Sequence, residues 1–169
     1  NFRRHFSSPE FCGALAKLLA AQVSFKANIV MNDERESADR VDAKSRKILN
    51  FGHTLGHALE KVTNFKHFKH GEAVGYGILF AAELSKRLEL LGQDELKLFN
   101  DVFQDVGRLP GLKNIGIESI VEAFSFDKKN IGSSLQWILL EGIGRPVIVS
   151  NKNVPLAILR STLEGILQK

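Results

Sequence analysis

Residues 71 to about 91 are nearly apolar on every side, and this stretch most constrains the fold. A helix with apolar residues all round must be buried, because it has no broad polar face to present to water. Gly92 follows at the kind of position where helices commonly end. The sequence therefore predicts a central helix that other elements cover. Its apolar residues include Ala73, Val74, Ile78, Leu79, Phe80, Ala81, Ala82 and Leu84.

Further helical patterns predict the elements around this central helix. Ser7 and Glu10 have capping-box spacing with Pro9 between them, which predicts a helix start. Apolar residues then recur at helical spacing, so a long amphipathic helix should run to about Met31. The same kind of pattern predicts helices over residues 94–106, 117–124 and 154–168.

One segment has a strand pattern instead. Residues 135–140 are rich in β-forming side chains, including Trp137, and glycines lie on both sides. Residues 146–149 could pair with this segment as a short hairpin. The expected fold class is mainly α with one small β-hairpin, in a single domain over residues 1–169.

The bulk composition excludes several classes of function. The 169 residues are 44% hydrophobic and 25% charged, as in a soluble globular chain of one ordinary domain. The net charge of +4 is modest and spread along the chain. It suits an anionic small substrate and argues against nucleic acid as a partner. Uncharged apolar runs stay well below the roughly 20 residues that span a bilayer, so no membrane partner is expected.

The single cysteine and the start of the chain bear on where the protein works. Cys12 has no second cysteine to pair with inside the chain, so we expect a reducing compartment and a cytoplasmic location. The basic residues near the start precede no apolar stretch, unlike those of a signal peptide. Met31 is the only methionine, so we expect the chain to be a piece of a longer protein.

A cluster of histidines is the strongest functional signal. Four of the five histidines fall within residues 53–70. His53 and His57 are spaced i, i+4 and would share one face of a helix, which Asn50 could cap. His70 begins the central apolar helix. Because neutral imidazole is a good ligand for zinc and similar ions, the segment predicts a metal-assisted catalytic site.

Two ligand sets are open for this site. A catalytic zinc commonly has three protein ligands and one open position, and His53, His57 and His70 could supply all three. Alternatively, two histidines bind the metal and a carboxylate from Glu60 or Glu72 completes the set. Histidines that only hydrogen-bond to their neighbours are the simpler interpretation. Their density in so short a glycine-flanked segment favours metal binding or catalysis.

Charged residues near the histidines are candidates for substrate contacts. The planar guanidinium of Arg46 suits a carboxylate or phosphate, although a surface Arg followed by a capping Asn50 explains the same residues equally well. Residues 32–47 form either a solvated helix or an exposed loop. Lys128 and Lys129 fall in a predicted loop, where they could reach an anionic group or belong to a hydrated turn.

Taken in order, these motifs resemble the C-terminal half of the 3-dehydroquinate synthases, which belong to the sugar-phosphate cyclases. The resemblance covers nearly the whole chain and is most specific in the histidine segment. It rests on Asp33-Glu34-Arg35-Glu36, on Arg46, on Asn50-Phe51-Gly52-His53-Thr54, on Gly56-His57-Ala58 with Glu60, on His70-Gly71-Glu72-Ala73-Val74 with Gly77, and on Asp127-Lys128-Lys129 followed by the Trp137 strand and Gly142-Ile143-Gly144.

The resemblance implies a lyase of the shikimate pathway, on the route to chorismate and the aromatic amino acids. Members convert 3-deoxy-arabino-heptulosonate 7-phosphate to 3-dehydroquinate and phosphate. NAD transiently oxidises an alcohol, and a metal, Zn²⁺ or Co²⁺, polarises the oxygen at the oxidised carbon. The resemblance further implies that an NAD-binding domain precedes residues 1–169 in the same polypeptide, and it allows a homodimer.

The resemblance also assigns the metal and substrate contacts. His53 and His70 would be metal ligands, and a glutamate from the preceding part of the polypeptide would be the third. His57 would face the substrate, while Arg46 and Asn50 would hold its anionic or hydroxyl groups. We therefore expect the isolated chain to bind zinc weakly and to show no turnover.

Four more residues match positions near the site of the family. Lys26 and Glu36 are two of them, and either Lys128 or Lys129 would contact the substrate. Glu36 and Arg46 lie ten residues apart, which is farther than in many family members.

Other functions stay open on sequence alone. A related sugar-phosphate cyclase would use a similar site. An iron-type alcohol dehydrogenase shares a His-Gly-Glu-like segment but would not need Arg46, Asn50 and the lysine pair. An inert helical fragment is the non-enzyme alternative, and zinc binding that does not change in His53→Ala and His70→Ala would favour it.

Overall fold

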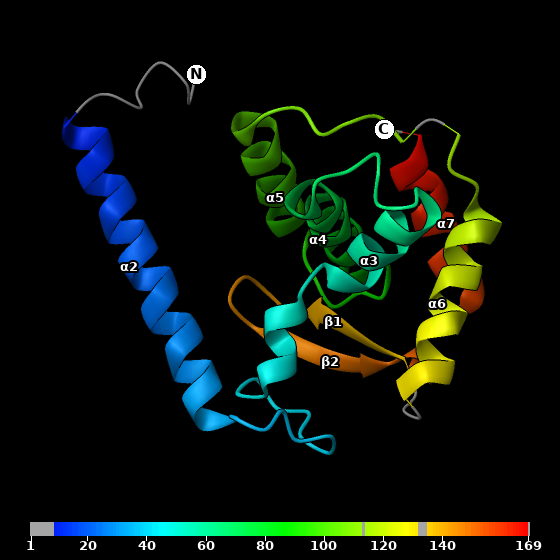
Figure 1. Ribbon diagram of the computed structural model, residues 1–169, viewed down its shortest axis with the longest axis horizontal. Coiled ribbons are helices and arrows are strands. Elements are labelled where there is room, and N and C mark those ends of the chain that lie inside the picture. The colour runs from blue at the N-terminus through cyan, green and yellow to red at the C-terminus, as the bar shows by residue number, and fades with distance from the viewer. Residues whose placement is uncertain (1–8, 113, 132–134, 169) are drawn as a thin grey trace.

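The computed structural model describes residues 9–112, 114–131 and 135–168, with side chains for all of these except 106 and 125–131. The described residues form six α-helices, two short 3-10 helices and one antiparallel hairpin, which confirms the mainly α fold (Figure 1). The elements are α2 (Pro9–Asn32), η1 (Arg46–Asn50), α3 (His53–Val62), α4 (His70–Arg87), α5 (Gln93–Val106), α6 (Ile117–Ile131), β1 (Gln136–Leu140), β2 (Pro146–Ser150), η2 (Asn151–Asn153) and α7 (Leu156–Leu167).

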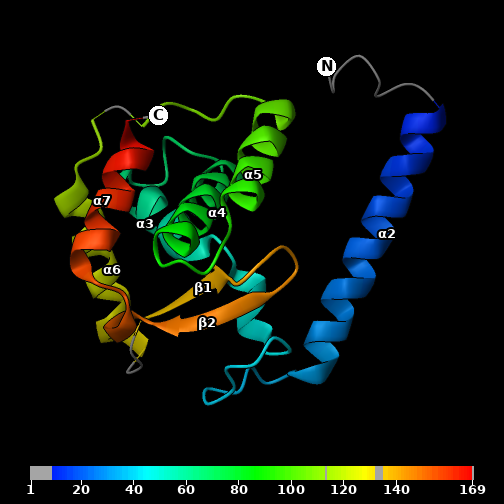
Figure 2. The same ribbon diagram turned by 180° about the vertical axis from the view of Figure 1, so that it is seen from behind.

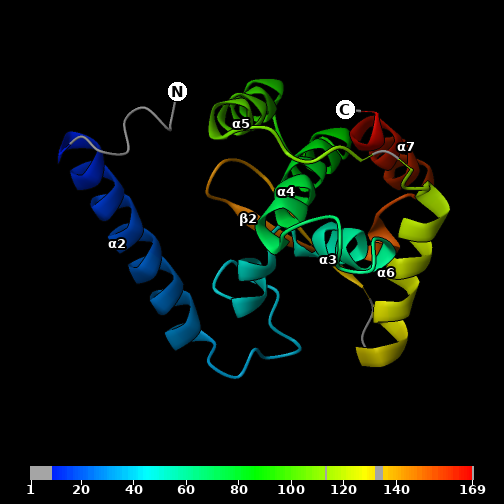
Figure 3. The same ribbon diagram turned by 45° about the horizontal axis from the view of Figure 1, so that its top comes forward.

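Helix α4 is the central helix that the apolar stretch predicted. Helices α3, α5 and α7 pack against it (Figure 3), and strand β1 also contacts it. Leu84 in α4 is fully buried, as are Leu59 in α3, Leu139 in β1 and Leu163 in α7. Since burying one such side chain contributes about 1.5–3 kcal/mol, this shared core holds the four elements together. The helix ends earlier than predicted, because Glu89 has a positive φ of 60° that leaves the helical path.

The hairpin is where the sequence pattern predicted it. Strands β1 and β2 pair antiparallel, with Trp137 opposite Val149. A buried serine attaches β1 to the central helix, because the hydroxyl of Ser85 donates to the carbonyl of Ala81 and accepts the N–H of Leu140. The sheet is thereby fixed against α4 by a polar contact as well as by apolar packing.

Helix α2 stands apart from the rest of the molecule (Figures 1 and 2). Ile29 is its only buried residue, and it packs against Ile48 and Ile138 at the C-terminal end of the helix. By length and composition, α2 is the one helix among the described residues that could cross a membrane. A helix that another part of a soluble protein covers passes the same test, so this finding does not assign a membrane.

Two local predictions were wrong. Helix α6 continues to Ile131, so the segment with Lys128 and Lys129 is helical where a loop was predicted. Asn50 does not cap the histidine helix, since Asn50 ends η1 and the N-cap of α3 is Gly52. The charged stretch after α2 is a loop of turns, which answers a question that the sequence left open.

Candidate metal and substrate site

Glycines let α3 and α4 cross at very short range. A Cβ at Gly77 would overlap the carbonyl oxygen of Gly52, and a Cβ at Gly56 would come within 3.2 Å of Val74. Gly52 also has a φ of 82°, which other residues rarely adopt. These contacts bring the first turn of α3 against the N-terminal half of α4, and both segments carry histidines.

The crossing brings three imidazoles together. The ring centroid of His53 lies 5.4 Å from that of His57 and 5.3 Å from that of His70. The rings of His57 and His70 are 5.9 Å apart. Two neighbouring turns of one helix and the start of another therefore present imidazole nitrogens to one small region, as the sequence predicted.

Two of these rings have their Nδ1 atoms next to an acceptor. Nδ1 of His70 lies 3.1 Å from Oε1 of Glu60, and Nδ1 of His53 lies 3.3 Å from the carbonyl oxygen of Phe51. When Nδ1 donates a proton, Nε2 of the same neutral ring is left with a free lone pair. In that tautomer each ring has Nε2 as the nitrogen that can bind a cation, and histidine ligands commonly have their other ring nitrogen bonded in this way.

Burial affects the charge of His53. Loss of water contact lowers the pKa of His53 from its ordinary value of 6.5, and the contact with Phe51 acts in the opposite direction. The neighbouring rings of His57 and His70 lower this pKa further, because a positive charge on any one ring disfavours protonation of the others. A lowered pKa keeps the imidazole neutral near pH 7, and the neutral ring is the form that binds metal.

Glu60 and Glu72 are the two carboxylates that could complete a ligand set, and the structure places only Glu60 at the imidazole cluster. The ligand atoms of His57, Glu60 and His70 all lie within 4.8 Å of one another. Glu72, in contrast, accepts the backbone N–H of Lys69 at 2.8 Å and so closes the start of α4. Glu60 is therefore the carboxylate at the imidazole cluster, either as a ligand or as the hydrogen-bond acceptor of His70.

The candidate substrate residues before the cluster lie on and around η1. Nε of Arg46 is 3.9 Å from Oε2 of Glu36, even though ten residues separate them in sequence. Asn50, at the other end of η1, is exposed and makes no side-chain hydrogen bond within the described part of the chain. Since η1 leads through Phe51 directly into α3, it places Arg46 and Asn50 on the segment just before His53.

Three further candidates are not joined to this cluster. Lys26 is exposed on α2 and has no hydrogen bond or ion pair to the histidines or to Arg46 among the described residues. Lys128 and Lys129 lie on α6, but their side chains fall outside the described residues. The predicted contact of one of these lysines with substrate therefore stays a prediction.

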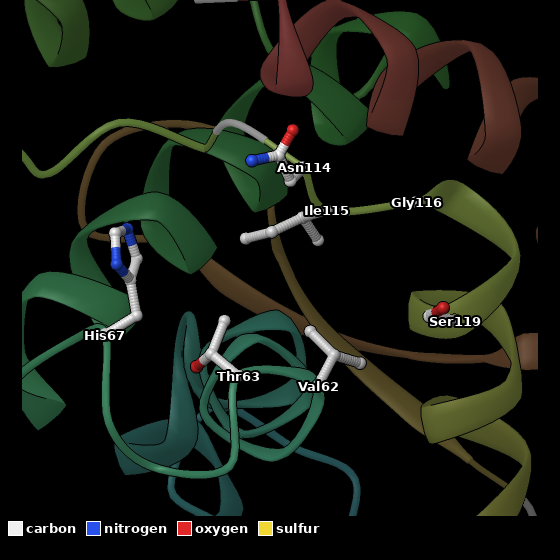
Figure 4. A pocket seen from close by; sticks show the side chains of 7 residues that line it. All are labelled: Val62, Thr63, His67, Asn114, Ile115, Gly116 and Ser119. Carbon is white, nitrogen blue, oxygen red and sulfur yellow. The ribbon is translucent and has the colours of Figure 1, made fainter.

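Two hollows lie beside the C-terminal half of α3. One, of about 280 Å³, is lined by His57, Ala58, Lys61, Phe65 and Ala123, so it opens beside the imidazole cluster. The other, of about 240 Å³, lies between the end of α3 and the start of α6 (Figure 4). His67 on its wall donates from Nε2 to the carbonyl of Gly111 at 2.8 Å. His67 therefore has a structural partner away from the other three histidines.

The sequence interpretation missed one residue of the site region. Asp33 was read as part of a solvated charged run, yet it is only 7% exposed. Its carboxylate accepts backbone N–H groups from Ser37 and Arg46. No periodicity could have shown this, because an irregular loop connects Asp33 and Ser37 to Arg46 at the start of η1. The only signal in the sequence was that Asp33 belongs, with Glu36, to the first motif of the resemblance.

Fold and site together define a class of protein: a helical domain in which two crossing helices bring imidazoles and a carboxylate together, beside a group of charged residues. The family profile described as 3-dehydroquinate synthase C-terminal matches residues 9–130. The chain belongs to this family, as its motifs implied.

Curated relatives of this chain are named 3-dehydroquinate synthase. It is 37% identical over 138 residues to a 3-dehydroquinate synthase of Nitrosospira multiformis, covering 82% of this chain and 36% of that protein. It is 40% identical over 131 residues to a 3-dehydroquinate synthase of Francisella tularensis, covering 77% of this chain and 35% of that protein. The chain thus spans about a third of the length of the curated relatives that it matches.

Solved structures with the same fold are sugar-phosphate cyclases. A 2-epi-5-epi-valiolone synthase from Streptomyces hygroscopicus with NAD⁺ and Zn²⁺ bound is 24% identical with a TM-score of 0.62, over 71% of this chain and 32% of that one. A 2-deoxy-scyllo-inosose synthase is 25% identical with a TM-score of 0.55, over 71% and 32%. The same kind of enzyme complexed with carbaglucose-6-phosphate, NAD⁺ and Co²⁺ is 24% identical with a TM-score of 0.52, over 73% and 34%.

Proposed function

We propose that this chain is the metal- and substrate-binding domain of a 3-dehydroquinate synthase. The whole enzyme would convert 3-deoxy-arabino-heptulosonate 7-phosphate to 3-dehydroquinate and phosphate. The single observation that carries the proposal is that the ring of His53 lies beside those of His57 and His70, whose ligand atoms converge with that of Glu60, on a chain whose family is established. The relatives at 35–40% identity are 3-dehydroquinate synthases, which favours this substrate over those of the related cyclases.

The donors at the cluster fit a zinc-like cation. Imidazole nitrogen and carboxylate oxygen are the ligands that such ions take in catalytic sites. We assign His53 and His70 as the ligands from this chain, because each has its Nδ1 next to an acceptor and its Nε2 free. Glu60 then acts as the acceptor that orients His70. A ligand from the preceding domain would complete the set.

The remaining side chains have chemistry that suits a sugar phosphate. His57 is exposed beside a hollow, where it can exchange a proton with a bound molecule. Arg46 presents a half-exposed guanidinium that can bind an anionic group. Asn50 can donate to and accept from a hydroxyl. In the whole enzyme, the metal would polarise a carbonyl oxygen and NAD would accept and return a hydride.

The partners follow from the same assignment. We propose that an NAD-binding domain of the same polypeptide supplies the cofactor, and that residues 1–169 form one domain beside it. Lys26, Glu36 and one of Lys128 and Lys129 would contribute to the shared site. Binding of an anionic small molecule, a cytoplasmic location, no nucleic-acid or membrane partner, and a homodimer are parts of this proposal.

Phosphate release tests the proposal. The full-length protein with NAD, Zn²⁺ and 3-deoxy-arabino-heptulosonate 7-phosphate should release phosphate, and residues 1–169 alone should not. Glucose 6-phosphate and sedoheptulose 7-phosphate serve as substrates that a related cyclase could prefer. Faster turnover of either sugar would assign the chain to another cyclase, and turnover by residues 1–169 alone would contradict the division into two domains.

A further inference from the structure

Asp33 joins two distant parts of the loop between α2 and η1. Its Oδ1 accepts the N–H of Ser37 at 2.9 Å. Its Oδ2 accepts the N–H of Arg46 at 2.8 Å and the hydroxyl of Ser45 at 3.3 Å. One carboxylate thus closes the loop over residues 37–45, so that the chain leaves the turn after α2 and returns to it at η1.

This location is unfavourable for a carboxylate taken alone. Asp33 directly follows the C-terminus of α2, where the helix dipole is negative, and it is nearly buried. The hydrogen bonds from the backbone of Ser37 and Arg46 outweigh burial and hold the pKa of Asp33 below its ordinary 3.8. Asp33 is therefore a stable anion at neutral pH, held by its donors.

The two oxygens of Asp33 bind the backbone beside Glu36 and at Arg46, respectively. The bond of Oδ1 closes the turn that contains Glu36, whose own N–H donates to the carbonyl of Asp33 at 3.2 Å. Glu36 has a positive φ of 49° in this turn, which is uncommon for a residue with a side chain. The bond of Oδ2 fixes the backbone of Arg46 at the first residue of η1.

The side chain of Arg46 then reaches back to the same turn. Its Nη1 donates to the carbonyl of Glu34 at 3.0 Å, and its Nε lies 3.9 Å from Oε2 of Glu36. The side chains of Arg46 and Glu36 are 41% and 44% exposed, so a ligand can still reach them. The orientation of the guanidinium therefore depends on contacts that Asp33 holds in place from both sides.

We propose that Asp33 is a positioning residue of the substrate site, which holds Glu36 and Arg46 together across the loop so that the guanidinium meets an anionic substrate in one orientation. This inference rests on the proposed function, in which Arg46 binds the substrate. Asp33 itself touches neither substrate nor metal.

The test is steady-state kinetics of the full-length enzyme with Asp33→Asn. The amide keeps one acceptor but turns an NH₂ group toward donors that need an acceptor. We expect the KM for the sugar phosphate to rise about tenfold, since a hydrogen bond to a charged group is lost. The KM for NAD and the affinity for Zn²⁺ should not change. A merely structural defect would instead lower the active fraction, and hence kcat, at a constant KM.

Asp42→Asn is the matched control. Asp42 lies in the same loop, accepts from Arg40 and from the N–H of Lys44, and loses the same charge. Its KM should equal that of the wild type. An equal rise of KM in Asp42→Asn would show an effect of loop charge and overturn the proposal.

A double variant tests whether Asp33 acts through Arg46. Asp33→Asn in an Arg46→Ala background should raise KM no further, because the group that Asp33 positions is gone. Effects that multiply would overturn the proposal. A normal KM in Arg46→Ala would refute the proposed substrate contact and the positioning role with it. A raised KM in Arg46→Ala with a normal KM in Asp33→Asn would refute the positioning role alone.

A milder variant covers the case in which Asp33→Asn does not fold. Ser45→Ala removes the hydroxyl that donates to Oδ2 of Asp33, and with it the N-cap contact of the same hydroxyl to the N–H of Lys47. We expect the KM for the sugar phosphate to rise about twofold to threefold, as for a weak neutral donor. An unchanged KM in folded Ser45→Ala would then count against the proposal.

Discussion

Oε1 of Glu60 lies 3.1 Å from Nδ1 of His70, so a carboxylate on α3 orients an imidazole on α4. The side chain of Glu60 is 10% exposed and that of His70 is 58% exposed, so the carboxylate is largely shielded from water while the ring stays accessible. A carboxylate in this position fixes the ring and makes Nε2 a stronger donor to a metal. The contact thus links the packing of two helices to the affinity of the proposed metal site.

Glu60→Gln should weaken zinc binding. The amide oxygen can still accept from Nδ1 of His70 but carries no charge, so we expect the zinc affinity of the full-length protein to fall about 10-fold to 100-fold. Competition with a chromophoric chelator measures the affinity. Glu83→Gln removes the same charge from the far part of α4, where Glu83 pairs with Arg87, and should bind zinc like the wild type. Equal affinities for all three proteins would contradict this role of Glu60.

The pKa of His53 should lie below its ordinary value of 6.5 in the metal-free protein. Burial lowers the pKa of His53 in the folded state, whereas the unfolded chain keeps a value near 6.5. The unfolded state therefore takes up a proton first as the pH falls through that value. The contribution of His53 to stability is present above this pH and is lost as the pH falls toward the lower, folded pKa. An NMR titration of the His53 ring with a midpoint at or above 6.5 would disprove this.

Gly77→Ala should destabilise the protein strongly. The new methyl group would overlap the carbonyl oxygen of Gly52, which is backbone and cannot rotate away. We expect a loss of about 3 kcal/mol, at the upper end for an overpacked core, with weaker zinc binding as α3 and α4 separate. Gly71→Ala is the matched control in the same helix, because its Cβ would meet open space. Chemical denaturation that finds equal stabilities would contradict the close crossing.

Helix α2 should be the least protected helix in residues 1–169 taken alone. Only Ile29 of its 24 residues is buried, and helices in water depend on packing for most of their stability. Amide hydrogen exchange should therefore be fast along α2 and slow along α4. If another domain covers α2 in the full-length protein, its exchange should slow there. Exchange in the isolated chain that is as slow in α2 as in α4 would refute this.

Elements with long apolar patterns could be predicted from the sequence. The all-round apolar stretch identified α4, and short β-forming segments between glycines identified the hairpin. Helix α6 was cut short in the prediction because Asp127, Lys128, Lys129 and Asn130 have the composition of a turn, and the structure continues the helix through them. The composition of these four residues therefore did not reveal where the helix ends.

The clustering of the histidines could be predicted from the sequence, but the contacts that support the site could not. Spacing put His53 and His57 on one helix face, and the structure adds that α4 brings His70 to the same place. The hydrogen bonds of Asp33 arise from an irregular loop, whose path no pattern in the sequence encodes. Such contacts depend on tertiary structure, so they appear only once the fold is known.

The zinc affinity of His70→Ala tests the central claim most directly, because His70 is a proposed ligand and its ligand atom lies within 4.8 Å of those of His57 and Glu60. In the full-length protein, His70→Ala and His53→Ala should each raise the zinc dissociation constant more than about 100-fold, beyond the usual loss for an outer-shell residue. His67→Ala should leave it unchanged, since that ring bonds to Gly111 away from the cluster. Equal dissociation constants for the wild type and His70→Ala would contradict a shared cation between α3 and α4.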